Sequence, residues 1–449
     1  MTAPDQSDNC CLHFTSSETQ PLACRAGNAI SLGQFQSDVE RLATQLQREG
    51  DTLISCPGRY AFSVGLLASW LSSRTVVLPP NHLDETLQEI RNRFDIAFEC
   101  DAQWGQQLPG NNSSAGHGSW ELQLPTDIHA VKLFTSGSTG TPKVITKSVA
   151  NLLDEARAIA AEFDWPAGPV VAGVPPQHLY GLTFSILLPW VLGNAWVDDM
   201  PRYPGDVLQA LQHNNGKTLI SVPAQYQATL EDGTDLRGIV CVSAAAPLPG
   251  SLARAWQQQH GTDILEIYGS TETGVVGHRR HTSTETWQAF PQVRLSVEQD
   301  LLKVDSPFVS DEFTGGFLTA DRVLLADQGQ FELLGRADAI VKIAGKRVSL
   351  TNIEDSICTC PGVAEAAVIA VPAKGLVRDM AIWAAVVAVG DYPLSPRQLQ
   401  AELRDKLDGI EIPRRILVVD RLPRTASGKL PGKAVANLFD ELDRSRVQL

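Results

Sequence analysis

Short apolar segments that alternate with helical segments restrict the possible fold of this chain more than any other feature of its sequence. Apolar residues recur at helical spacing in 31–50, where Ser31 can cap a helix and Gly50 can end it, and a further helix is expected at 62–71. The apolar runs have the length of buried strands and occupy 52–56, 75–79, 217–223, 238–244 and 263–269. Strands and helices in this order predict an α/β fold, with parallel sheets covered by helices.

The pattern changes after Gly269. Alternating apolar and polar residues at 293–307 and 329–336 predict antiparallel hairpins. The last part of the chain combines expected strands with one expected helix, at 364–371, 381–389, 415–423 and 396–408. We therefore predict an N-terminal domain over residues 1–335 and a small α+β domain over residues 336–449.

The apolar segment 181–197 bears on where the chain resides. It contains Thr183, Ser185, Pro189 and Asn194, so we expect a buried helix rather than a membrane span. The first nine residues are polar and acidic, and they have no basic segment of the kind that opens a signal peptide. The eight cysteines lack zinc or redox spacing. We expect a cytoplasmic chain with reduced cysteines and no membrane partner.

The net charge of −14 is divided unevenly along the chain. From Gly335 onward, 17 Lys and Arg stand against 14 Asp and Glu, a net charge of +3, whereas the preceding 334 residues carry −17. The overall acidity argues against general binding to nucleic acids. It does not exclude a nucleotide ligand, because a phosphate pocket needs only local positive charge.

The segment Leu133–Thr146, LFTSGSTGTPKVIT, carries the strongest local signal for chemistry. Glycines let backbone N–H groups converge on anionic oxygens, hydroxyl groups add donors, and Lys143 adds a compact positive charge. Gly137, Gly140 and Lys143 do not have Walker spacing, and an expected strand rather than a helix follows. A phosphate-binding loop is one interpretation of this segment, and a Ser- and Gly-rich surface turn is the other.

The loop resembles the [ST]-S-G-[ST]-T-G-x-P-K signature of the adenylate-forming superfamily of acyl- and aryl-CoA synthetases and peptide-synthetase adenylation domains. Further segments resemble its other motifs in the same order along the chain: PPQHLY at 175–180, IYGSTETG at 267–274, GRADAIVKIAGKRV at 335–348 and LPRTASGK at 422–429. The resemblance spans about residues 30–435. It implies a large N-terminal domain of two parallel-type sheets plus a small distorted β-barrel, and a small mobile α+β C-terminal domain.

The resemblance implies ATP and Mg²⁺ as cofactors and assigns roles to individual residues. The expected nucleotide-binding residues are Thr135, Ser136, Gly137, Ser138, Thr139, Gly140, Lys143, Ala244, Ala245, Tyr268, Gly269, Asp321 and Arg336. Thr271 is expected to contact the α-phosphate, Glu272 to bind Mg²⁺ and Lys429 to reach both the acyl carboxylate and the α-phosphate. Asp338 matches the hinge about which the C-terminal domain turns, which would present Lys342 to a thiol. Taken singly, Glu272, Arg336 and Asp338 could equally be a capping acid, a surface ion pair and a turn former.

The acid pocket implied by the resemblance is lined by His178, Tyr180, Gly181, Ser243, Ala244, Gly269, Ser270, Val275 and Val276. His178 is expected to be an aromatic gate, or else an ordinary buried histidine. Many relatives have glycine where Ala244 stands, and the added methyl group disfavours bulky acids. These positions include no charged side chain, so an uncharged aryl acid or a short-to-medium acyl acid fits best.

The implied reaction joins a small carboxylic acid to a phosphopantetheine thiol. The GSTETG segment followed by His278-Arg279-Arg280 is most similar to ligases of aryl-polyene and xanthomonadin-type pigment pathways, which would make an acyl carrier protein the partner. A synthetase that uses free CoA is the first alternative. A non-catalytic acyl- or nucleotide-binding relative is the second, although Lys143, Glu272 and Lys429 are all retained.

Overall fold

The computed structural model describes residues 11–16, 21–25, 27–46, 48–108, 118–125, 128–135, 143–337, 340–343, 346–372, 380–390, 392–424 and 430–447. The chain divides into two compact units. The first contains 1–296, 303–317 and 326–331, and the second contains 297–302, 318–325 and 332–449. The domain boundary at 335/336 stays a prediction.

One sheet of the first unit has the strand order β6-β4-β5-β8-β9. Its strands are β4 (Asp51–Ile54), β5 (Val76–Val77), β6 (Ile96–Cys100), β8 (His129–Thr135) and β9 (Lys143–Ser148). The first four are parallel to their neighbours, and β9 is antiparallel to β8. Its connecting helices are α2 (Arg59–Leu71), α3 (Asp84–Arg93) and α4 (Ala102–Gln107). The strands predicted at 52–56 and 75–79 and the helix predicted at 62–71 are therefore confirmed.

A second, larger sheet has the order β20-β21-β16-β15-β14-β13-β12-β10-β11-β2-β3, in which β20 is Asp321–Leu325. From β2 to β14 it is parallel, and antiparallel strands flank this part on both sides. The parallel strands are β2 (Ala23–Arg25), β10 (Val170–Ala172), β11 (Trp196–Val197), β12 (Thr218–Ser221), β13 (Val240–Ser243) and β14 (Ile264–Ser270). The antiparallel strands are β3 (Asn28–Ile30), β15 (Gly274–Arg280), β16 (Trp287–Ala289) and β21 (Gln330–Arg336).

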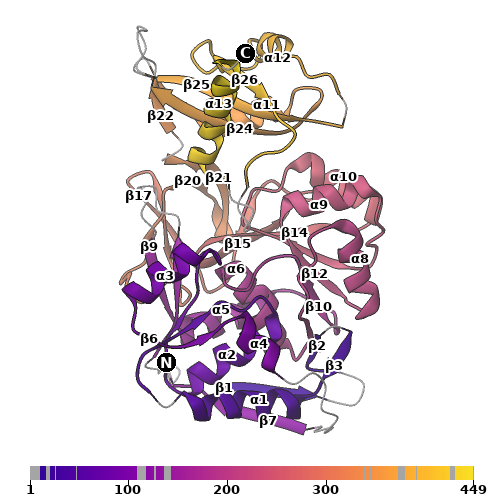
Figure 1. Ribbon diagram of the computed structural model, residues 1–449. Helices are drawn as coiled ribbons and strands as arrows, with labels where there is room; N and C mark the ends of the chain where they lie inside the picture. The colour runs from indigo at the N-terminus through magenta and orange to yellow at the C-terminus, as the bar shows by residue number, and fades with distance from the viewer. Residues whose placement is uncertain are drawn as a thin grey trace. The chain divides into compact units, whose positions relative to one another are not determined.

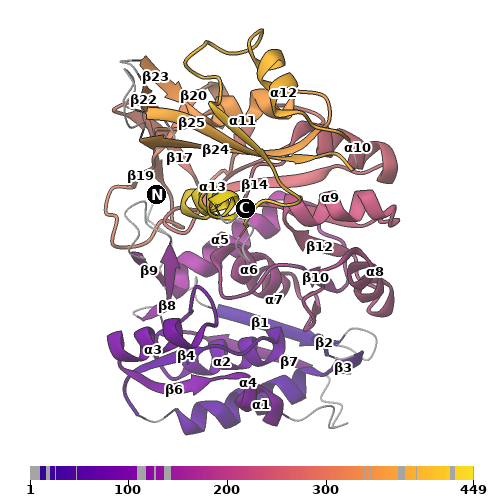
Figure 2. The same cartoon turned by 45° about the horizontal axis from the view of Figure 1, so that its top comes forward.

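Helices cover both faces of this sheet. On one face lie α8 (Pro204–His213), α9 (Pro223–Asp232) and α10 (Gly250–His260), in a row that both views show (Figures 1 and 2). Their apolar residues share one core with Val171, Leu219 and Ile264 of the strands. A second core joins helices α1 (Leu32–Gln45), α2, α5 (Val149–Glu162) and the segment after His178. Ser31 caps α1 as predicted, accepting a hydrogen bond from the backbone N–H of Gln34.

The apolar segment 181–197 forms buried helices as far as Leu192, as predicted, and ends in the strand β11. α6 (Leu179–Leu182) runs through a π-helical turn (Thr183–Leu187) into α7 (Leu188–Leu192), and most of its side chains are buried. Among the helices that the structure describes, none is both long enough and apolar enough to cross a membrane.

The strands of the first unit that were not predicted include a pair near the start of the chain. β1 (Cys11–Ser16) pairs antiparallel with β7 (Gly118–Gln123), and Phe14 stands opposite Trp120. The rings of these two residues stack with centroids 5.8 Å apart.

The second unit holds an α+β fold, as predicted for the last part of the chain. β24 (Val363–Pro372) is antiparallel to β25 (Met380–Ala388), which is parallel to β26 (Arg415–Val418). Helices α11 (Leu350–Cys358) and α12 (Pro396–Leu403) pack on one face of these strands, and α13 (Gly432–Val447) packs on the other. The remaining elements of the chain are divided between the two units. They are β22 (Ile340–Ile343), β23 (Lys346–Ser349), β17 (Arg294–Glu298), β18 (Leu301–Asp305), β19 (Phe317–Leu318) and the short 3₁₀ turn Asp327–Gly329.

Candidate active site

The carboxyl ends of β13 and β14 bring together two of the segments singled out in the sequence. Ser243, the last residue of β13, pairs with Glu266, so β14 continues beyond β13 through Tyr268 to Ser270. In sheets of this type, ligands bind at the carboxyl ends of the strands. After Ser243 the buried Ala244 is followed by Ala245, whose φ of +71° is the left-handed conformation that alanine rarely adopts.

The segment after β14 is a tight and internally bonded turn. The backbone N–H of Ser270 donates to Oγ1 of Thr273 at 3.1 Å, and the backbone N–H of Thr273 donates to Oγ of Ser270 at 3.2 Å. A Cβ atom at Gly269 would lie 2.3 Å from the carbonyl oxygen of Gly274, so this approach requires glycine. The partly exposed Thr271 and Glu272 lie between these bonded residues.

Two buried charged residues, Lys147 and Glu155, hold this turn. The Lys147 amine, near the end of β9, donates to the carbonyl oxygens of Glu272, at 3.0 Å, and of Phe308. Glu155 in α5 accepts hydrogen bonds from the backbone N–H of Val275, at 2.8 Å, and from the Thr183 hydroxyl, at 3.2 Å. Burial lowers the pKa of Lys147 to about 8 and raises the pKa of Glu155, and the opposite charge of each residue partly offsets the shift of the other.

The predicted wall of the acid pocket begins where α6 begins. His178 is half-buried at the N-cap of α6. The Tyr180 hydroxyl donates toward the carbonyl oxygens of Ser221, at 2.9 Å, and Val242, at 3.0 Å, which fixes this ring against the ends of β12 and β13. A Cβ atom at Gly181 would lie 1.9 Å from the carbonyl oxygen of Pro175, so the helix start is packed directly on the preceding loop.

The glycine-rich segment joins two antiparallel strands. Thr135 at the end of β8 is paired with Lys143 at the start of β9, and the Lys143 side chain is exposed. The predicted phosphate contacts Ser136, Gly137, Ser138, Thr139 and Gly140 lie outside the described residues.

Tyr268, predicted to stack on adenine, contacts other rings with one part of its surface. Its ring centroid is 5.6 Å from that of Trp287 and 5.9 Å from that of Phe331, and the side chain remains partly exposed.

In the second unit the two residues predicted to bind ribose lie together. The Arg336 guanidinium is 3.7 Å from the Asp321 carboxylate. The backbone N–H of Ala337 donates to the carbonyl oxygen of Ala320 at 2.7 Å, which keeps the two segments side by side. The predicted residues Asp338 and Lys429 lie outside the described residues, and Lys342 is described only by its backbone, in β22.

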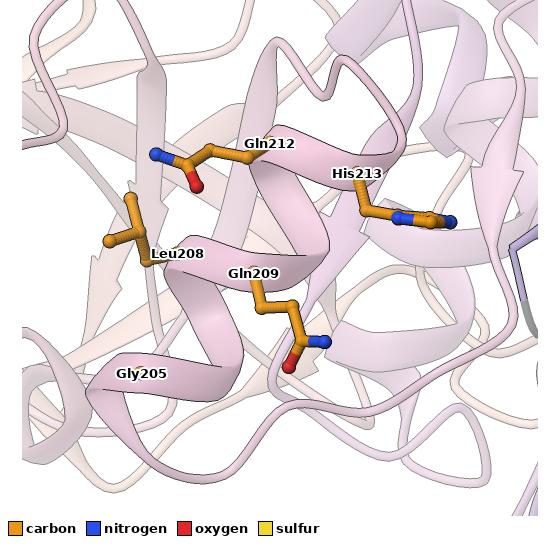
Figure 3. A pocket seen from close by; sticks show the side chains of 5 residues that line it. All are labelled: Gly205, Leu208, Gln209, Gln212 and His213. Carbon is orange, nitrogen blue, oxygen red and sulfur yellow. The ribbon is translucent and has the colours of Figure 1, made fainter.

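The structure therefore brings together the predicted residues of β13, β14 and the turn after β14 in the first unit, and Asp321 with Arg336 in the second. Within the described part of the chain, no three acidic, histidine or cysteine side chains are grouped as a ready-made metal site. A hollow on α8 is lined by Gly205, Leu208, Gln209, Gln212 and His213. Its side chains diverge from the helix rather than converge on a point (Figure 3), so we assign it no role.

The prediction missed Lys147 and Glu155, although the sequence holds a signal for each. Lys147 interrupts an apolar strand pattern immediately before the helix cap Ser148. Glu155 lies three residues after Leu152 and four before Ile159, on the buried face of α5. A charged residue at an apolar position of the pattern marks a buried contact.

Two family models and several known proteins match the sequence of this chain. Residues 13–304 match the model of the AMP-binding enzyme family, and residues 352–429 match that of the AMP-binding enzyme C-terminal domain. An anthranilate–CoA ligase from Pseudomonas aeruginosa is 29 % identical over 347 residues, which cover 69 % of this chain and 66 % of the relative. A benzoate–CoA ligase from Thauera aromatica is 27 % identical over 342 residues, 68 % of this chain and 65 % of the relative. The matches thus span slightly under two thirds of the length of these two relatives.

A solved structure has the same fold. The ATP-bound MatB from Rhodopseudomonas palustris superposes with a TM-score of 0.78 at 20 % sequence identity, covering 95 % of this chain and 97 % of that one.

Proposed function

This chain belongs to the AMP-binding enzyme family, and from that premise we propose that it is an acid–thiol ligase that uses ATP to activate a carboxylic acid. In the first step the carboxylate attacks the α-phosphate of ATP, which forms an acyl-adenylate and releases pyrophosphate. In the second step a thiol attacks the acyl carbon and releases AMP. The observation that carries this proposal is the bonded turn after β14, which holds Thr271 and Glu272 just beyond the carboxyl end of that strand.

The first step brings two anions together, so cations and oriented donors must offset their repulsion. We assign Lys143 and the hydroxyl residues before it to the β- and γ-phosphates, and Thr271 to the α-phosphate. Tyr268 is assigned to adenine, and Asp321 with Arg336 to ribose. We assign Lys429 to the developing charge between the carboxylate and the α-phosphate. Asp338 and Lys342 are assigned to the second step, as hinge and thiol-facing residue.

The residues present fit Mg²⁺ bound with ATP. Mg²⁺ is commonly held by one or two carboxylates together with phosphate oxygens and water. Glu272 offers one partly exposed carboxylate, and no group of three potential ligands lies elsewhere in the described residues. When bound, Mg²⁺ would neutralise phosphate charge, while Glu272 orients it.

For the acid we propose an uncharged aryl acid, with a short-to-medium acyl acid as the alternative. Two relatives carry the names of aryl acids, anthranilate and benzoate. The proposed lining residues Ala244, Val275 and Val276 are apolar and suit an aromatic ring. His178 and Tyr180 are assigned to the mouth of this pocket.

For the thiol we propose phosphopantetheine. Both relatives are CoA ligases, which favours free CoA, and an acyl carrier protein is the second candidate. Two residues of the His278-Arg279-Arg280 segment, which suggested the carrier protein, make contacts inside the fold. His278 lies 3.2 Å from Glu162, and Arg279 lies 2.7 Å from Glu266. These contacts account for His278 and Arg279 without a carrier protein.

The test is exchange of labelled pyrophosphate into ATP, measured with a panel of aryl and acyl acids. We expect exchange that depends on the acid and is abolished in Lys429→Ala. The matched control is Lys433→Ala, an exposed lysine four residues later, which should retain exchange. Absence of exchange with every acid would reject the ligase and favour the non-catalytic relative.

Mass spectrometry then identifies the thiol that accepts the acyl group. An active acid is incubated with ATP and either CoA or a phosphopantetheinylated carrier protein. Rapid formation of acyl-CoA without a carrier would exclude the carrier protein as the required partner, whereas acylation of the carrier alone would exclude free CoA.

A further inference from the structure

Two segments that are distant in the sequence meet at the amine of Lys147. This residue is the penultimate one of β9, the strand that follows the glycine-rich segment. It donates to the carbonyl oxygen of Glu272, in the turn after β14, and to that of Phe308, in a loop more than 150 residues away. The backbone N–H of Ser310 also donates to the Glu272 oxygen, at 3.1 Å. The Glu272 carbonyl is therefore held by two donors from different segments.

Glu155 binds the chain just after the same turn. Its two carboxylate oxygens accept from the backbone N–H of Val275 and from the hydroxyl of Thr183. Val275 belongs to the proposed wall of the acid pocket, and Thr183 begins the π-helical turn after Gly181. Gly274, which lies between the two anchored residues, has a φ of +70°, and a Cβ atom there would lie 2.7 Å from Phe308.

A contribution to the stability of the fold does not by itself explain why the charged side chains of Lys147 and Glu155 are buried here. Lys147 is 0 % exposed and Glu155 is 2 % exposed. Removing two charges from water is costly, and well-packed apolar residues in place of a buried ion pair are often neutral or stabilising. A lysine at this place instead provides what an apolar residue cannot, which is several N–H donors on one atom.

We propose that Lys147 and Glu155 are positioning residues that fix residues 271–276, so that the proposed Mg²⁺ ligand Glu272 and the acid-pocket residue Val275 keep one relative geometry. The inference rests on the proposed function for the roles of Glu272 and Val275. Neither Lys147 nor Glu155 touches the reacting atoms. Both act through the backbone of the turn.

Hydrogen exchange of the full-length protein tests the contact independently of activity. In Lys147→Met, which keeps the length of the side chain but removes its donors, we expect amides of residues 270–276 to exchange at least tenfold faster than in the unmodified protein. The matched control is Arg74→Met. Arg74 is also buried and donates to two backbone carbonyls, those of Gly50 at 2.7 Å and Asp51 at 3.1 Å, in the other sheet. The Arg74→Met variant should leave the hydrogen exchange of amides 270–276 unchanged.

Kinetics test the consequence for the reaction. In Lys147→Met we expect the Mg²⁺ concentration for half-maximal pyrophosphate exchange to rise severalfold and kcat to fall at least tenfold. A structural role alone would instead lower the amount of folded enzyme and leave the Mg²⁺ dependence unchanged, as we expect for Arg74→Met.

A milder variant covers the case in which Lys147→Met does not fold. Glu155→Gln can still accept from the Val275 N–H, but its neutral oxygen is a weaker acceptor than a carboxylate, and its amide nitrogen cannot accept from Thr183. The Val275 amide should therefore exchange faster, by a smaller factor than in Lys147→Met. Unchanged exchange at 270–276 in the folded variants would overturn the inference, even if the enzyme is an active ligase. Faster exchange in a protein that activates no acid would reject the proposed function while the anchoring contact remained.

Discussion

The guanidinium of Arg336 lies 3.7 Å from the carboxylate of Asp321, and the two side chains differ in exposure: 54 % for Arg336 and 18 % for Asp321. An ion pair this exposed contributes under about 1 kcal/mol to stability. The pair therefore adds little to the stability of the fold, and its side chains are better suited to binding a ligand. A carboxylate held in this way can accept hydrogen bonds from both hydroxyl groups of a ribose.

We accordingly predict that Asp321→Asn weakens ATP use with little change in stability. Loss of a charged hydrogen bond costs about 1.5–3 kcal/mol, so KM for ATP should rise roughly 10- to 100-fold in the exchange assay. Asp305→Asn, which removes the exposed partner of Arg294 at 2.7 Å, is the control and should leave this KM unchanged. An unaltered KM for ATP in Asp321→Asn would remove this residue from the nucleotide site.

The methyl group of Ala244 should set the size of the acid that is accepted. Ala244 is buried at the end of β13, and Ala244→Gly adds the space of one methyl group. We expect the ratio of kcat/KM for a larger aryl acid over a smaller one to increase about tenfold, because one methyl group is worth about 1–3 kcal/mol in such a pocket.

The neighbouring Ala245→Gly provides the matched control for that experiment. Ala245 is exposed and has a φ of +71°, so glycine should relieve strain and raise stability by about 1 kcal/mol. Its acid preference should remain that of the unmodified enzyme. If both variants shift the preference equally, the pocket does not depend on Ala244.

Gly181 should tolerate no side chain. The Cβ atom of Gly181→Ala would lie 1.9 Å from the backbone oxygen of Pro175, which cannot move without displacing the loop before His178. We expect a loss of about 2–4 kcal/mol, seen in chemical denaturation, together with weaker acid binding. Gly205→Ala is the control, since nothing lies within 4 Å of its Cβ position in α8, and it should be neutral or stabilising.

Periodicity predicted some of the helices and strands, because apolar faces are local properties of the chain. The strands around 52–56 and 238–244 and the Ser31-capped helix follow from spacing alone. The amino-acid composition of a segment predicted its secondary structure less well than periodicity did. Residues 105–118 are rich in Gly, Ser, Asn and Gln, which is typical of a loop, yet Gly105–Gln107 belong to α4, which Asp101 caps by accepting from the Trp104 N–H at 2.7 Å.

The contacts that hold the candidate site were beyond prediction for a different reason. The bond from Lys147 to Glu272 joins residues 125 positions apart, and the bond from Val275, just after the Ser270–Thr273 turn, to Glu155 in α5 joins residues 120 positions apart. Such partners depend on how the sheet and helices pack. The sequence motifs could therefore indicate Glu272 but not the residues that support it.

Glu354 should make the second unit lose stability as the pH rises. This carboxyl group, in α11, accepts a hydrogen bond from the backbone N–H of Val368 at 2.8 Å, and burial together with the nearby Asp355 raises its pKa to about 7. In the unfolded chain its pKa is close to the ordinary value of 4.5. Between pH 4.5 and 7 the folded state therefore holds a proton that the unfolded state has released, and stability falls as the pH increases through this window.

Glu354→Gln should remove this loss, because glutamine keeps the acceptor for the Val368 N–H and never becomes charged. At pH 8 we expect the variant to be more stable than the unmodified protein by about 1–3 kcal/mol, and at pH 4.5 we expect little difference. Hydrogen exchange of α11 and β24 at the two pH values measures this in the full-length chain. Asp405→Asn, at an exposed residue of the same unit, controls for the loss of one negative charge. An equal stabilisation by Glu354→Gln at both pH values would show that Glu354 does not take up a proton on folding, since only that uptake makes the difference depend on pH.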